Sequence, residues 1–286
     1  MGNNKLFSLA TGFVDSKTTE KISSPLFGKQ EKSNYNNLRY EDFICCSAGE
    51  DFSIIVNKRG DVFAYGANYY GECNVPNMPP IIKVKSSSFH TIALSNRGTV
   101  HSWGWLNPPI DDDIEVIDVA CCSGHNVTLD RFGNVRVYGN SQLMQPPSYV
   151  KDVRYIDAQL HSILAISNDE IIVWGNGPFI REKVKNVVSA HLMRDDVIIL
   201  KSDGTLSSLF GQRYKLENIV FVSTSEISIA CLDVNGKIFM LGEHNDYNQL
   251  CPPDGEGFSF VSISALHGLA IKSGIIYSWG LVESYL

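Results

Sequence analysis

The chain has 286 residues, of which 44% are apolar and 19% are charged, so it holds enough apolar material for the core of a globular fold. Its formal net charge of -7 and pI near 5.5 argue against a domain that binds nucleic acid, because such domains gather lysine and arginine on one face. We therefore expect no nucleic-acid partner.

The N-terminal residues carry no recognisable membrane or export signal. The chain has no run of 18 apolar residues, and the opening MGNNKLFSLATGF lacks the basic flank and long apolar core of a secretory signal. Myristoylation at Gly2 is not supported, because Leu6 stands where that motif needs Ser or Thr. These observations predict a cytoplasmic chain without a transmembrane segment.

Seven copies of one short pattern follow each other along the chain. They read GDVFAYG (60–66), GTVHSWG (98–104), GNVRVYG (133–139), DEIIVWG (169–175), GTLSSLF (204–210), GKIFMLG (236–242) and GIIYSWG (274–280). The last residues of successive copies lie 32–38 residues apart. A regular period of this size indicates a repeat architecture.

Each copy belongs to a small antiparallel sheet. Apolar residues alternate within the copies, which predicts strands, and a second strand such as HTIALS (90–95) precedes each copy. The links between the two supply the Gly, Asn or Asp that a hairpin turn with positive φ needs. A third strand, such as IIKVKSS (81–87), comes before each hairpin. Radial stacking protects the edges of such sheets, so we predict an all-β, seven-bladed β-propeller, with a β-solenoid as the alternative.

The ends of the repeats suggest how the ring packs and closes. The recurrent Gly is expected to be close-packed, and the aromatic residue before it to wedge between adjacent blades. Phe210 replaces this Gly and predicts a distorted fifth blade. Residues 5–10, KLFSLA, look like an extra strand that closes the ring on the C-terminal blade. Residues 11–42 are interpreted as a polar insertion or mobile loop, and 43–280 as the seven repeats of one domain over 1–286.

The repeats resemble those of the regulator of chromosome condensation family. The stretches SSSFHTIALSNRGTVHSWG (86–104) and FAYGANYYGECNVP (63–76) carry the resemblance most clearly, and it covers the chain from Phe43 to Gly280. It implies a seven-bladed propeller that serves many tasks in different relatives, among them nucleotide exchange on the small GTPase Ran. The units have the compact form of bacterial members, which include effectors that act on host Ran. That likeness adds the alternative that the chain is translocated into a host cell.

The sequence offers little sign of catalysis. It has no nucleophile elbow, metalloprotease motif or phosphate-binding loop, so we expect no conventional catalytic site and no cofactor. The seven cysteines form no CxxC pair and are interpreted as small buried residues. Four histidines are assigned to one repeat position, which distributes them around a ring where they cannot converge on a metal ion, and each is expected to bond to a neighbouring strand: His90, His125, His161 and His267.

Aromatic residues recur in the loops after the aromatic-glycine pairs, which should all emerge on one face. Tyrosine and tryptophan are the side chains that anchor protein interfaces, although such residues also cap blade ends. Nearby carboxylates would make this face suitable for a basic protein partner, as would the acidic run 111–113 with Glu115, which is otherwise a solvated loop. The predicted binding residues are Tyr69, Tyr70, Glu72, Trp105, Tyr214, Glu243, Asp246 and Tyr247.

Three functions are compatible with these features. The first is a monomeric, non-enzymatic propeller that binds a protein through one face, and the resemblance implies a small GTPase of the Ran type. The second is guanine-nucleotide exchange activity on that GTPase. The third is inhibition of an enzyme by insertion into its active site, as in the β-lactamase inhibitor that shares the repeat.

Overall fold

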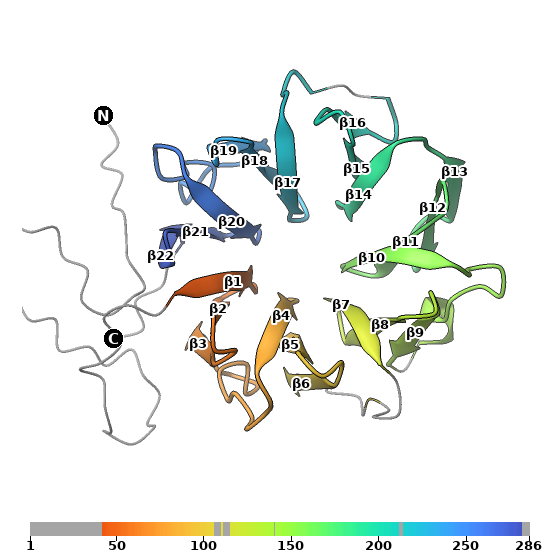
Figure 1. The fold of residues 1–286 in the computed structure, drawn as a ribbon, viewed down its shortest axis with the longest axis horizontal. Helices are drawn as coiled ribbons and strands as arrows, with labels where there is room; N and C mark the ends of the chain where they lie inside the picture. The colour runs from red at the N-terminus through yellow and green to blue at the C-terminus, as the bar shows by residue number, and fades with distance from the viewer. Residues whose placement is uncertain (1–41, 106–109, 111–114, 140, 212–213, 282–286) are drawn as a thin grey trace, which may run out of the picture.

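The protein, seen in a computed structural model, is described over residues 42–105, 110, 115–139, 141–211 and 214–281. These residues form seven antiparallel sheets arranged as blades around a central axis (Figure 1). The closed ring confirms the predicted all-β, seven-bladed propeller and excludes the solenoid. No α-helix occurs within the described ranges, which contain one short 3-10 turn, η2 (Gln142–Met144). We number the blades one to seven in chain order.

Each blade contributes one strand to each of three concentric positions. The first strands lie nearest the axis (Figure 1): β1 (Phe43–Ala48), β4 (Ile81–Ser86), β7 (Val116–Cys122), β10 (Val153–Gln159), β14 (Val187–Leu192), β17 (Ile219–Thr224) and β20 (Phe258–Ile263). The second strands are β2 (Phe52–Asn57), β5 (His90–Ser95), β8 (His125–Asp130), β11 (Ser162–Ser167), β15 (Val197–Lys201), β18 (Ser228–Asp233) and β21 (His267–Lys272). The third strands are β3 (Val62–Gly66), β6 (Val100–Gly104), β9 (Val135–Tyr138), β12 (Glu170–Gly175), β16 (Leu206–Ser208), β19 (Ile238–Gly242) and β22 (Ile275–Gly280).

Two blades depart from the common pattern. Blade four has a fourth strand, β13 (Ile180–Lys183), which pairs with β12. Blade five has the shortest third strand, β16, which ends at Ser208, shortly before Phe210. Since the glycine of the other repeats is missing there, the shortened strand agrees with the distortion predicted for this blade.

The hydrophobic core is divided into clusters that lie between adjacent blades. One cluster, for example, joins Ile54 and Val56 of blade one to Ala93 and Trp103 of blade two. A corresponding cluster joins blade seven to blade one, where Ile55 packs with Leu269, Ile271 and Ile276. The second strands are buried on both faces because each is covered by the blades on either side. The described residues therefore close the ring themselves. The closing strand predicted at residues 5–10 lies outside the described residues, as does nearly all of the insertion predicted at 11–42.

In three blades a tryptophan near the end of the third strand bonds to the linker from the previous blade, and the glycine after it packs closely within its own blade. The indole Nε1 of Trp103 donates to the carbonyl of Glu72 at 2.7 Å, and Trp279 repeats this contact with Gln249 at 2.8 Å. At Gly104, where φ is +98°, an added Cβ would collide with the carbonyl oxygen of Phe89. The aromatic residue is thus the expected wedge, and the glycine occupies a backbone position that excludes a side chain.

A ring of hydrogen bonds links neighbouring blades around the axis. A β-bulge near the start of every first strand sets its register, so that the fifth residue of each strand occupies an equivalent position beside the channel. In four blades the side chain at this position accepts a hydrogen bond from a backbone N–H of the following blade. The accepting residues are Ser47, Asp157, Ser223 and Ser262. In the other three blades the position holds Lys85, Ala120 and His191.

Candidate partner-binding face

The loops between first and second strands lie on the same side of the ring as the ends of the third strands. Backbone hydrogen bonds show this directly, because Ala67 N donates to Asp51 O at 2.8 Å and Trp105 N donates to Phe89 O at 2.9 Å. We call this side the loop face. The hairpin turns between second and third strands lie on the opposite side, which we call the turn face.

Three aromatic side chains meet on the loop face between blades one and two. Tyr70 comes from the linker after blade one, Phe89 from the first loop of blade two, and Trp105 from the end of β6. Their ring centroids lie 5.4 Å apart for Tyr70–Phe89 and 6.0 Å for the other two pairs. Tyr70 remains 53% exposed and Trp105 42% exposed. We call these residues the aromatic triad. The structure thus brings together two predicted residues and adds Phe89, which a search limited to the linkers could not find.

Glu72 does not lie on the exposed surface and is a correction to the predicted site. Its side chain is 1% exposed, and its Oε2 accepts the backbone N–H of Tyr70 at 2.8 Å. Gln249 has the same role in the linker after blade six, where its Oε1 accepts the N–H of Tyr247 at 2.9 Å. Glu72 therefore holds the loop that presents Tyr70, and its carboxylate is not available to a partner.

The other predicted residues are separate from the triad. Tyr69 is highly exposed and lies beside Tyr70 in the chain, whereas Tyr247, Glu243 and Asp246 are exposed in the linker after blade six. Tyr214 is half-buried and packs against the cluster between blades five and six. Burial raises its pKa, with a smaller contribution from Asp196. Among the described residues, no ring contact joins Tyr214 or Tyr247 to the triad. The residues of the predicted acidic run, 111–113, lie outside the described ranges, while Glu115 pairs with Arg131 at 2.7 Å.

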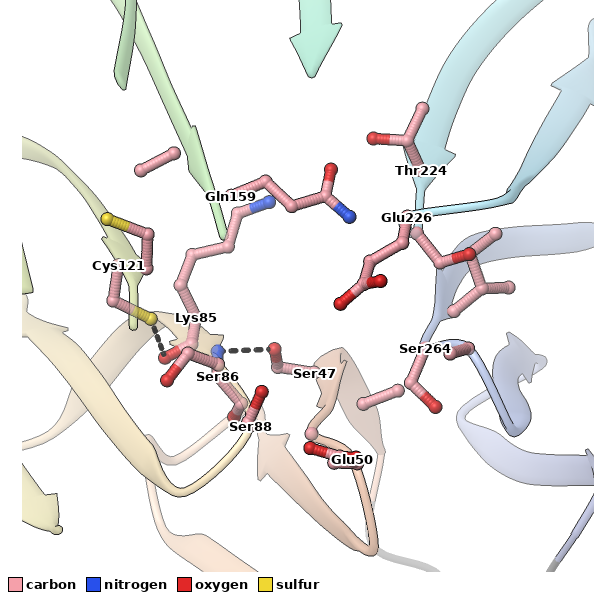
Figure 2. A pocket seen from close by; sticks show the side chains of 18 of the residues that line it. Ser47, Glu50, Lys85, Ser86, Ser88, Cys121, Gln159, Thr224, Glu226 and Ser264 are labelled. Atoms are coloured by element: carbon pink, nitrogen blue, oxygen red, sulfur yellow. Dashed lines mark hydrogen bonds between the residues drawn. The ribbon is translucent and has the colours of Figure 1, made fainter. Parts of the chain in front are cut away.

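A cavity of about 140 Å³ opens on the loop face at the end of the central channel. It is lined by the ends of the first strands and by the loops that follow them. Figure 2 shows the side chains of Lys85 and Gln159 entering the cavity from one side and Glu226, Ser264 and Glu50 lying on the other. Most of the nine serines that line it already make hydrogen bonds within the protein. Ser47, for example, accepts the N–H of Ser86 at 2.8 Å.

Two titratable groups in the cavity wall are strongly affected by burial. Asp157 is 7% exposed, and burial raises the pKa of its carboxyl group, while Lys85 and the backbone N–H of Leu192 act in the opposite direction. Burial also lowers the pKa of His191 to about 3, helped by the positive charges of Lys85 and Lys83. His191 is therefore neutral at physiological pH, and its ring contacts Ser189 and Tyr155.

Three of the four histidines make hydrogen bonds within the fold, and the fourth, His161, was assigned to the wrong repeat position. His267 lies between Ser53 of blade one and Ser264, each 3.0 Å from a ring nitrogen, and His90 Nδ1 lies 2.7 Å from Ser87. Hydroxyl groups thus contact His90 and His267, whereas His125 has the backbone contacts that we predicted, with Nδ1 2.8 Å from Ser123 O and Nε2 3.4 Å from Ser141 N. His161 is exposed and lies one residue before the repeat position, which Ser162 occupies opposite Gly175. No group of three or more potential metal ligands occurs in the described part of the chain.

Residues 81–107, which contain the three strands of blade two and Trp105, match the family described as "Regulator of chromosome condensation (RCC1) repeat". Blade two therefore resembles a repeat of this family. The short pattern found in the sequence recurs in the other six blades. The described residues contain no helix with the length and apolar character needed to cross a membrane.

Two curated proteins resemble the chain over most of its length. It is 20% identical over 323 residues to the X-linked retinitis pigmentosa GTPase regulator homolog of Caenorhabditis elegans, covering 82% of this chain and 23% of the relative. It is 21% identical over 285 residues to the secretion-regulating guanine nucleotide exchange factor of Bos taurus, covering 83% of this chain and 55% of the relative. The chain therefore spans about a quarter and about half of the lengths of these relatives.

Solved structures show the same fold in proteins of different kinds. Prp20p from Saccharomyces cerevisiae, described with its binding to Gsp1p and histones, has a TM-score of 0.62 and 14% identity over 83% of this chain and 82% of its own. The CRINKLY WD40 ectodomain of the Arabidopsis thaliana receptor kinase ACR4 has a TM-score of 0.67 and 15% identity over 85% of this chain and 96% of its own. At this level of identity the likeness establishes the fold, and function depends on the surface of this chain.

Proposed function

We propose that this chain is a non-enzymatic, protein-binding propeller that engages a small GTPase of the Ran type through its loop face. The observation that carries the proposal is the aromatic triad, because Tyr70 and Trp105 remain exposed although their rings contact each other and Phe89. Exposed, preorganised tyrosine and tryptophan side chains are typical of the centres of protein interfaces. The names of the two curated relatives, a GTPase regulator and a nucleotide exchange factor, support the class of partner.

Binding to a Ran-type GTPase can be measured by titration calorimetry with single variants of the triad. Tyr70→Ala and Trp105→Ala should each weaken binding by about 1–3 kcal/mol, the usual range for aromatic residues at the centre of an interface. Phe132→Ala is the matched control, since this aromatic side chain is 73% exposed in the hairpin turn of blade three, on the turn face. Equal effects of all three changes would exclude the loop face as the interface, and a lack of binding by the unmodified chain would exclude the partner.

Nucleotide exchange is the second candidate function, favoured by the exchange factor among the curated relatives. An exchange factor must bind the nucleotide-free GTPase more tightly than the loaded form, because a ligand shifts an equilibrium only through its differential affinity. Release of a fluorescent nucleotide from the loaded GTPase measures this activity directly. Release at the intrinsic rate, together with measurable binding, would remove the exchange function and leave the binding function in place.

A further inference from the structure

The chain contains two Asn-Gly pairs in its blades, and they lie in different kinds of turn. Asn176-Gly177 follows the end of β12, and Asn235-Gly236 lies in the hairpin turn between β18 and β19. The first pair is on the loop face, because Asn176 N donates to His161 O at 2.9 Å in the first loop of blade four. The second pair is on the turn face. Both asparagines are exposed.

An Asn-Gly pair can rearrange without an enzyme. The backbone nitrogen of the glycine attacks Cγ of the asparagine side chain, a C–N bond forms, and the amide nitrogen leaves as ammonia with the proton of the glycine N–H. Water then opens the resulting succinimide at either carbonyl, so the product is a mixture of aspartate and isoaspartate. Glycine favours this reaction because it has no side chain to hinder the approach of its nitrogen.

The hairpin turn restrains Asn235-Gly236 against this reaction. Gly236 N, the atom that would attack, donates to Asp233 O at 2.9 Å. Asn235 N donates to Asp233 Oδ1 at 3.0 Å, and Asn235 O accepts from Gly257 N at 2.8 Å. Gly236 is also buried and has a left-handed φ of +73°. An attack must therefore break the hydrogen bond of the attacking N–H and move a fixed stretch of backbone.

Asn176-Gly177 lacks these restraints on its reacting groups. Gly177 is exposed, and its N–H donates to no acceptor within the described ranges. The side-chain amide of Asn176 likewise makes no hydrogen bond to any part of the chain that the structure describes. The bond from Asn176 N to His161 O fixes the start of the pair, but it involves neither the attacking nitrogen nor the carbon that is attacked.

We propose that Asn176 is a site of spontaneous deamidation, whereas Asn235 is protected by its turn. The reaction converts a neutral amide into a carboxylate, so it adds a negative charge to the loop face of blade four. Each isoaspartate also lengthens the backbone after β12 by a methylene group. The inference is independent of the proposed partner, because water is the only other reactant.

Ageing of the full chain at mildly alkaline pH, followed by digestion and mass spectrometry, compares both sites in one sample. Asn176 should deamidate at least about tenfold faster than Asn235, since breaking a backbone hydrogen bond at Gly236 costs about this factor. The product at Asn176 should contain isoaspartate as well as aspartate. Gly177→Ala should slow the reaction at Asn176, because a methyl group hinders the attacking nitrogen, and should leave Asn235 unchanged. Thermal melting establishes that this variant is folded.

Peptides of residues 172–180 and 231–239 give the unfolded reference, and they should react at similar rates. Equal rates at the two asparagines of the folded chain, or a faster reaction at Asn235, would overturn the proposal. A product at Asn176 that is aspartate alone would also overturn it, since direct hydrolysis of the amide gives no isoaspartate. A difference between the peptides as large as that in the protein would assign the effect to sequence and refute the role of the turn.

Discussion

His267 should make the stability of the ring depend on pH. Its imidazole is 5% exposed and lies between Ser264 and Ser53, so it connects blade seven to blade one where the ring closes. Burial lowers the pKa of His267 from 6.5 to about 4. The folded protein therefore resists protonation at a pH where the unfolded chain already binds a proton, and folding loses free energy as the pH falls below 6.5.

The size of this effect follows from the two pKa values. With a pKa of 6.5 in the unfolded chain and about 4 in the folded one, the protonation linkage of this single histidine removes about 2.5 kcal/mol of stability between pH 7.5 and pH 4.5. His90 and His191, whose pKa values are lowered to about 4 and about 3, contribute to the same trend. Replacing one histidine isolates its share.

The measurement is urea unfolding of the unmodified chain and of His267→Gln at both pH values. The glutamine cannot titrate, so the variant should lose about 2.5 kcal/mol less than the unmodified chain on acidification, in addition to any fixed cost of the substitution. Phe132→Ala on the turn face is the control, because its exposed side chain has no titratable group and the pH dependence should stay as in the unmodified chain. An identical pH dependence of the unmodified chain and His267→Gln would refute the reasoning.

Three further substitutions test the backbone, the loop and the channel by thermal or urea unfolding. Gly104→Ala should destabilise far more than Gly211→Ala, because both have φ near +100° but an added Cβ meets backbone only at Gly104; similar losses would contradict this. Glu72→Ala should cost about 1–2 kcal/mol by removing the acceptor of the Tyr70 N–H, whereas Glu72→Gln should be tolerated, since Gln249 makes the same contact; equal losses would exclude this role. Asp157→Ser should raise stability at pH 7, because burial disfavours the ionised carboxylate in the folded protein. The gain should disappear below pH 3.8, where this carboxyl group is protonated in the unfolded chain as well. No gain at pH 7 would show that the contacts of Asp157 fully compensate the cost of its burial.

The sequence was sufficient for the fold because one pattern recurs in it seven times. The hairpin turns show the physical basis: the positive φ values at Gly98 and Gly133, and at Asn168 in blade four, belong to the residue types that the pattern supplied. The inner strands could be recognised for the same reason. A cluster between each pair of blades then follows from stacking apolar sheets in a closed ring.

The site was only partly predictable, since contacts across blades depend on register. His161 and Gly175 have the same spacing as His90 and Gly104, but the turn of blade four is one residue shorter, so Ser162 pairs with Gly175. The charge of Glu72 suggests an exposed side chain, yet its carboxylate turns inward to accept the backbone N–H of Tyr70 in the same loop. Phe89 comes from a different loop than the tyrosine and tryptophan that it contacts.

The equivalent positions around the channel can change their side chains without a change of fold. Each of the seven blades places one side chain at an equivalent position of its first strand, and in four blades this side chain accepts a hydrogen bond from the following blade. The other three blades hold Lys85, Ala120 and His191, so the fold tolerates a cation, a methyl group or a neutral ring at this position. Point substitutions at this position can therefore change the charge of the channel wall, while the loops and the outer strands remain as they are.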